Sequence, residues 1–222
     1  MNINDKINNG REYRNFQVPM EIRAKEDDGM IVEGYATTFN EKYLLWEEDG
    51  YEVWEQVDAR AFENTDMSDV IMQYNHEGRV FARLSNGTLE LDVDEHGLKV
   101  RADLGGTEIG RQLYEEIKGG YTNKMSFGFI VSADEVENNK ENKTTVITRT
   151  ITNISKLFDV SAVSIPANDG TAISARSFSD GVIAEAEAER QRAEAEEEKR
   201  LHKQKALQLR LKLMEVNDER NS

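Results

Sequence analysis

The chain of 222 residues contains no cysteine, and this absence excludes several kinds of chemistry. Without thiols the protein cannot form disulfides, bind a metal through thiolates or act as a cysteine protease. Its three histidines are His76, His96 and His202, too few to favour a metal site built from several imidazoles. We therefore expect no metal, no cofactor and a reducing compartment, and few positions are open to a histidine base.

Positive charge and long apolar runs are also scarce. The formal net charge is -15 at pH 7, which disfavours nonspecific binding of nucleic acid. No apolar run approaches the roughly 20 residues that a membrane span requires, and the first residues lack the hydrophobic core of a secretion signal. The sequence thus predicts a soluble, acidic, cytoplasmic protein that binds neither nucleic acid nor membrane.

Composition divides the chain into three parts. Residues 1–15 are polar and rich in asparagine, which predicts a disordered N-terminal arm. Residues 16–178 contain many short runs of alternating apolar residues and one clear helical stretch, which begins after Thr107 and is stopped by Gly119-Gly120. Many short strands with a few helices indicate a mainly β (α+β) domain, and we expect a closed or nearly closed antiparallel β-barrel.

Turn residues predict how several of these strands are connected. The runs 16–22 and 30–36 flank a turn and should form a hairpin. Asn86-Gly87 is a strong signal for a two-residue hairpin turn, and Glu95-His96-Gly97 marks a second turn. The polar stretch Asn138–Asn142 predicts a loop that ends the strand beginning near residue 124.

The third part, residues 179–222, predicts a helical interaction tail. Residues 183–216 contain no glycine or proline and are rich in alanine, glutamate, arginine, lysine and leucine, which is typical of one long helix. Acidic residues come first and basic residues last, as the helix dipole favours. A polar helix with no core to pack on is marginal alone, so we expect self-association or a partner. Leucines alternate with period two over 207–213, which leaves open a strand donated to a partner.

One serine occupies a position that suits a nucleophile. Ser126 lies where a loop, Gly119–Asn123, becomes an apolar strand-like run, and such a serine can be held rigidly. A serine hydroxyl is inert until a positioned base removes its proton. The candidate base is His76, which follows the apolar run 70–74 after Asn75, and the candidate orienting acid is Asp159. The alternatives are a serine satisfied by the backbone and an ordinary surface histidine.

Three segments, taken together and in order, resemble the prohead (capsid maturation) serine protease family of tailed bacteriophages: Tyr74-Asn75-His76-Glu77, Lys124-Met125-Ser126-Phe127-Gly128-Phe129 and Leu157–Asn168. The resemblance extends from about Phe16 to Arg176, and Asp159-Val160-Ser161 with Pro166-Ala167-Asn168 is its most distinctive part. It implies a barrel like that of the herpesvirus assembly proteases, with the C-terminal helix appended to it.

The resemblance also implies roles for individual residues. Ser126 matches the nucleophile of the family and His76 its general base. Asp159 falls where relatives usually have an acidic residue, often glutamate, and would orient the histidine, although a purely structural carboxylate is the alternative. The herpesvirus enzymes use a second histidine there, and only His96 is available for that part, in a predicted turn. The loop Gly119–Lys124 is a candidate for the oxyanion amides.

The implied function is that of a serine endopeptidase that cleaves capsid or scaffold protein, and itself, inside the immature capsid in the host cytoplasm. Its partners would be the major capsid protein and the scaffolding segment of that protein, on which residues 180–222 could dock. The main alternative is a non-enzymatic internal scaffold protein, and a second is a hydrolase of small esters. Ser126 is not in a Gly-x-Ser-x-Gly elbow, which argues against an α/β-hydrolase.

Overall fold

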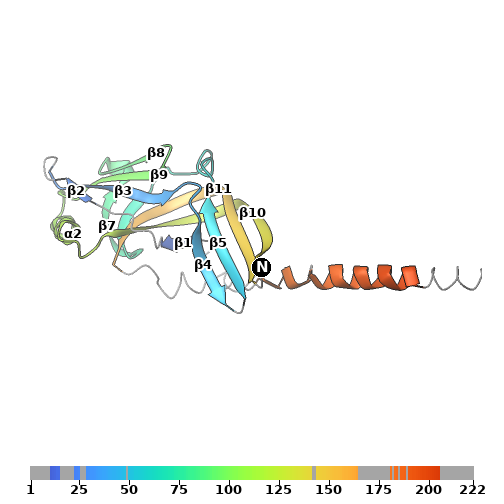
Figure 1. Ribbon diagram of the computed structural model, residues 1–222. Helices are drawn as coiled ribbons and strands as arrows, with labels where there is room; N and C mark the ends of the chain where they lie inside the picture. Colours follow the sequence, from blue (N-terminus) through green and yellow to red (C-terminus); the bar gives the residue numbers. More distant parts are fainter. Residues whose placement is uncertain are drawn as a thin grey trace, which may run out of the picture. The chain divides into compact units, whose positions relative to one another are not determined.

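The computed structural model describes residues 11–15, 23–25, 29–48, 50–141 and 144–164, together with most of 181–205. The chain divides into two compact units, Met1–Ser179 and Asp180–Ser222. Among the described residues, every strand belongs to the first unit, and the second unit is helical (Figure 1).

In the described part of the first unit, the larger of two sheets has seven strands. Its main path runs in the order β1-β10-β11-β5-β4, while β6 joins β11 and β7 joins β6. These strands are β1 (Glu12–Asn15), β4 (Tyr43–Glu48), β5 (Tyr51–Val57), β6 (Ile71–Tyr74), β7 (Glu77–Arg83), β10 (Lys124–Glu141) and β11 (Thr144–Val163). The long antiparallel pair of β10 and β11 forms the centre of this sheet.

The smaller sheet is antiparallel and has the order β2-β3-β9-β8. Its strands are β2 (Arg23–Lys25), β3 (Ile31–Thr38), β8 (Leu89–Val93) and β9 (Gly97–Asp103). Helix α2 (Glu108–Lys118) starts where the sequence predicted, because the Thr107 side chain accepts a hydrogen bond from the Gly110 amide at 3.0 Å. Its buried side chains Leu113, Tyr114 and Ile117 belong to the apolar core.

The prediction of a mainly β domain is confirmed, but its antiparallel arrangement is wrong for two strand pairs. β11 runs parallel to β5 along Thr145–Ile151 and parallel to β6 along Asp159–Ala162. The path through the described strands ends at β1 and at β4 without closing, so the barrel itself is not confirmed. Alternation of apolar residues identifies a strand, whereas the direction of its neighbours depends on contacts distant in sequence.

The N-terminal arm also differs from the prediction. Residues 12–15 were expected to be disordered, yet they form β1, which pairs antiparallel with β10; residues 1–10 lie outside the described residues. The strand was not recognised because its inward side chain, Arg14, is charged and packs against charged partners instead of apolar ones.

A cluster of buried, charged side chains links β1 to β5 and β11 through ion pairs. Arg14 and Glu55 are 1% and 0% exposed and form a bidentate ion pair, in which one of the two hydrogen bonds measures 3.0 Å. Arg149 donates to Glu55 at 2.8 Å and to Glu12 at 2.9 Å, and the Tyr43 hydroxyl also donates to Glu55. Burial alone would raise the pKa of the Glu55 carboxyl, but the two guanidinium groups outweigh it and lower that pKa.

Replacing Glu55 by alanine should cost about 3–5 kcal/mol of the free energy of unfolding, because the substitution removes the one fully buried carboxylate that pairs with both the Arg14 and the Arg149 guanidinium. Denaturant unfolding monitored by circular dichroism measures this loss. The matched control is Glu90→Ala, which removes an exposed ion pair with Arg101 and should cost less than about 1 kcal/mol. Equal losses in the two variants would contradict the prediction.

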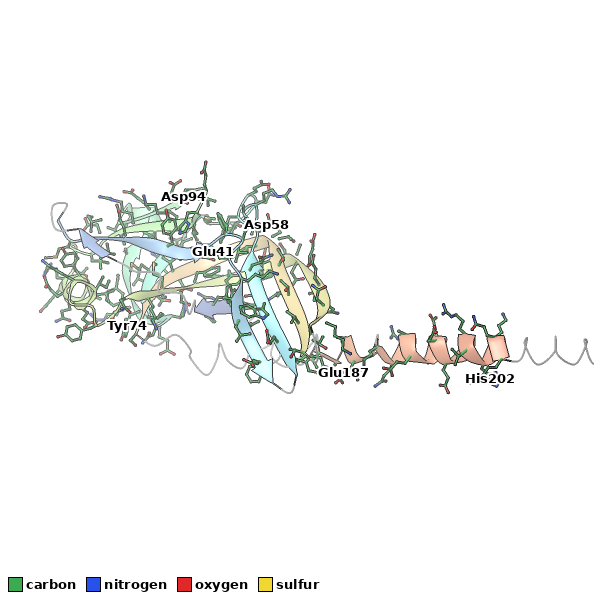
Figure 2. All side chains as sticks on the ribbon, viewed as in Figure 1. Glu41, Asp58, Tyr74, Asp94, Glu187 and His202 are labelled. Atoms are coloured by element: carbon green, nitrogen blue, oxygen red, sulfur yellow. The ribbon has the colours of Figure 1, made fainter. Side chains whose placement is uncertain are left out.

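The second unit is a solvated helix. Its described residues between 181 and 205 are helical and mostly exposed, and side chains such as the labelled His202 project away from the axis (Figure 2). Two ion pairs bind neighbouring turns, Arg190 with Glu194 at 3.8 Å and Arg200 with Glu197 at 3.3 Å. The alternating leucines at 207–213 lie outside the described residues. No helix in the described part of the chain combines the length and hydropathy needed to cross a membrane.

Candidate active site

His76 lies in a two-residue turn between β6 and β7. Tyr74, which is labelled in Figure 2, pairs with Glu77 across the turn, and the two residues between them, Asn75 and His76, have φ values of 50° and 61°. Positive φ at both central positions is the backbone of a type I′ turn. Glycine usually takes the second position, so placing histidine there costs of order 1–3 kcal/mol.

Contacts with the end of β11 stabilise this turn. The Asn75 amide donates to the carbonyl of Ala162 at 3.0 Å, and the Asn75 side-chain oxygen accepts from the Ser164 amide at 3.2 Å. The preceding strand β6 is itself paired with β11. The left-handed conformation of His76 is therefore imposed by tertiary contacts, and the imidazole has a fixed position relative to β11.

Strand register places Ser126 and Asp159 on the same face of the sheet. In β10, Met125 and Phe127 are buried in the apolar core, so Ser126 faces the opposite side. Ser126 pairs with Ser161 of β11, and the next residue on the same face of β10, Gly128, pairs with Asp159. The serine and the aspartate therefore lie on adjacent strands, two residues apart in register.

The three predicted residues are hydrogen bonded in sequence. Nε2 of His76 lies 2.5 Å from Oγ of Ser126, and Nδ1 of His76 lies 2.5 Å from Oδ1 of Asp159. The Ser161 hydroxyl donates to the same Oδ1 at 2.9 Å. Ser126 and Asp159 are 0% exposed, and the His76 side chain is 6% exposed. A carboxylate thus holds one imidazole nitrogen while the other faces a hydroxyl.

The environment keeps the Asp159 carboxyl ionised. Burial alone would raise its pKa, but the hydrogen bond with His76, the guanidinium of Arg11 and the Ser161 hydroxyl outweigh burial, and the pKa is lowered. Arg11 forms an ion pair with Oδ2 of Asp159, the oxygen that does not face His76. An ionised aspartate accepts a hydrogen bond from Nδ1–H of the neutral imidazole, which leaves Nε2 free to accept one from Ser126.

The Ser126 hydroxyl has a second acceptor. Its Oγ lies 2.8 Å from the backbone carbonyl of Arg14 in β1. A hydroxyl carries one proton, so that proton is directed either to the carbonyl or to His76. The backbone of β1 therefore takes part in the hydrogen bonding of this hydroxyl.

The structure brings together Ser126, His76 and Asp159 and places the other candidates elsewhere. His96 lies in the turn between β8 and β9 of the smaller sheet, where its ring contacts Tyr35 at 4.6 Å. Within the loop Gly119–Lys124, the candidate for the oxyanion amides, the amides of residues 119–122 donate to carbonyls of α2. Within the described residues, no group of three or more potential ligand side chains is placed to hold a metal ion.

Sequence reasoning missed the residues that surround the cluster. Arg11 and Tyr13 belong to the segment expected to be disordered, and the Tyr13 ring lies 4.5 Å from that of His76. Gly128 was noted only as part of a motif. The alternation of Arg11, Tyr13 and Asn15 with Glu12 and Arg14 was the available signal, but a strand without apolar residues does not stand out from a polar arm.

A hydroxyl, an imidazole and a carboxylate hydrogen bonded in this order form the arrangement of a serine hydrolase. The model of the family Peptidase_S78, caudovirus prohead serine protease, matches residues 18–182. The chain therefore belongs to the caudovirus prohead serine protease family. Searches of curated proteins and of solved structures find no significant match to the chain.

Proposed function

We propose that the protein is a capsid maturation endopeptidase in which Ser126 is the nucleophile, His76 the general base and Asp159 the residue that orients the base. Its substrates are the capsid protein and the scaffolding segment of that protein, inside the immature phage capsid in the host cell. The observation that carries this proposal is the pair of 2.5 Å contacts that link Ser126, His76 and Asp159 in a member of a serine protease family.

The chemistry is acyl transfer. His76 removes the proton of Ser126 as the oxygen attacks the peptide carbonyl, and the imidazolium then gives this proton to the leaving amine. Water repeats the sequence and releases the acyl group. Asp159 holds Nδ1–H of His76 and stabilises the imidazolium formed in both steps. Backbone amides must bind the developing oxyanion, and loss of one such donor typically slows catalysis about 10²–10³-fold.

Ser126 is fully buried, so binding of a peptide must expose its Oγ. The proposal also includes self-cleavage and a barrel of the herpesvirus-protease type. In it, the tail docks on the scaffolding segment and mediates self-association.

Co-expression with the major capsid protein of the same phage tests the function. We expect intact mass spectrometry to show a shortened capsid protein when the chain is present and the full-length capsid protein when it is absent. A control expression of the scaffolding segment alone, without capsid protein, tests whether assembly is needed for cleavage. A capsid protein that stays intact in assembled particles containing the chain would favour the non-enzymatic scaffold instead.

A further inference from the structure

Strand β1 lies beside the nucleophile but outside the region that defines the family. The family model begins at residue 18, whereas β1 spans Glu12–Asn15 and pairs with β10 so that Asn15 is opposite Ser126 and Tyr13 is opposite Gly128. Membership of the family therefore says nothing about the contribution of this segment to the site.

Arg11, directly before β1, contacts the aspartate of the site. Its guanidinium forms an ion pair with Oδ2 of Asp159 and stacks on two rings, at 4.4 Å from the centre of Phe158 and 5.0 Å from that of Tyr13. The Nε of Arg11 is buried and makes no hydrogen bond in the part of the chain that the structure describes. Such an unsatisfied group is uncommon in proteins and calls for an explanation.

Gly128 provides the space for this contact. A Cβ atom on Gly128 would lie 2.3 Å from Oδ2 of Asp159, 2.9 Å from Cε1 of Tyr13 and 3.0 Å from Nε of Arg11. All three groups therefore pack directly on the backbone of β10. Tyr13 in turn packs against the His76 ring with centroids 4.5 Å apart. The same small region therefore contacts Asp159 directly and His76 through Tyr13.

We propose that Arg11 is a positioning residue of the active site and that residues 11–14 complete that site from outside the family region. This inference rests on the proposed function. Arg11 holds Oδ2 of Asp159, which leaves Oδ1 directed at His76, while Tyr13 supports the imidazole and the Arg14 carbonyl receives the Ser126 hydroxyl.

The experiment compares Arg11→Ala, Arg11→Lys and the wild-type full chain, with purified major capsid protein as substrate. Arg11→Ala should lower kcat about 10–100-fold with little change in KM, because a small displacement of a catalytic group is costly. Arg11→Lys should restore part of kcat, because it keeps a positive charge beside Oδ2 of Asp159. Arg101→Ala in β9 removes a comparable arginine from the smaller sheet and should behave as wild type.

The outcomes separate this inference from the proposed function. Wild-type kcat and KM in Arg11→Ala, with cleavage still lost in Ser126→Ala, would overturn the inference and leave the proteolytic function intact. No cleavage by the wild-type chain would overturn both. If Arg11→Ala does not fold, Gly128→Ala serves as the test variant. Its added Cβ would displace Arg11, Tyr13 and Asp159 without removing any of these side chains. An unchanged kcat in a folded Gly128→Ala would also refute the inference.

Discussion

Replacement of Ser126 by alanine should abolish processing of the capsid protein, with a loss of about 10⁶-fold in kcat. The substitution removes the oxygen that lies 2.5 Å from Nε2 of His76, and no covalent acyl intermediate forms without it. The change deletes one buried atom on a strand whose core contacts are made by the neighbouring residues, so the fold should persist. Intact mass of the capsid protein after co-expression with each variant measures the effect.

Ser161→Ala is the matched control for this substitution. Ser161 is also 0% exposed, lies opposite Ser126 in the adjacent strand and donates to Asp159 at 2.9 Å. Because it only supports the aspartate, its loss should slow processing far less than loss of Ser126. Full processing by Ser126→Ala, in cells that contain no other protease for the capsid protein, would refute the assignment of the nucleophile.

The three residues of the candidate site could be named because their segments, taken in order, resemble those of a known family. The local patterns alone, a histidine one residue after a short apolar run, a serine that opens another and an aspartate within a third, left a backbone-satisfied serine and an ordinary surface histidine open. What the patterns could not give is the pairing of β6 with β11 in parallel. That pairing brings the histidine turn over the strand that carries Asp159, and it depends on a long connection whose path no local signal encodes.

The long strands β10 and β11 show a second limit of prediction from the sequence. A loop was expected at Asn138–Asn142, but β10 continues through Glu141 and pairs with β11 from Thr144 onward. The side chains of the described residues 132–140 are exposed on β10, so this part of the hairpin needs no apolar alternation. Cross-strand hydrogen bonds and β-branched partners on β11 hold it in register.

The turn predicted at Asn86-Gly87 is present, but it does not connect two paired strands as a hairpin would. Gly87 has φ of 75° and ends a short 3₁₀ turn, Leu84–Asn86. The flanking strands are not paired with each other, because β7 joins the larger sheet and β8 the smaller one. A left-handed glycine specifies the local direction of the chain and not the partner of the next strand. The Glu95–Gly97 turn, by contrast, does join the paired strands β8 and β9.

Replacement of Asp159 by asparagine should slow processing about 10⁴-fold while the protein stays folded. Arg11 determines this result, because a guanidinium group donates hydrogen bonds and cannot accept them. The amide oxygen of asparagine must therefore face Arg11, which places the NH₂ group opposite Nδ1 of His76. Nδ1 then has to accept, the ring proton moves to Nε2, and His76 presents N–H to Ser126 instead of a base.

A second Asp→Asn substitution provides the comparison. Asp66 pairs with Lys156 at 2.8 Å on the surface, so Asp66→Asn removes a similar charge away from the site and should leave the processing rate unchanged. Rates follow from a time course of capsid-protein intact mass after induction of each variant. A rate for Asp159→Asn within tenfold of wild type would make Asp159 a structural carboxylate. A double variant, Asp159→Asn with Arg11→Ala, frees the amide to rotate and should recover part of the lost activity, because the oxygen can again face Nδ1–H of His76.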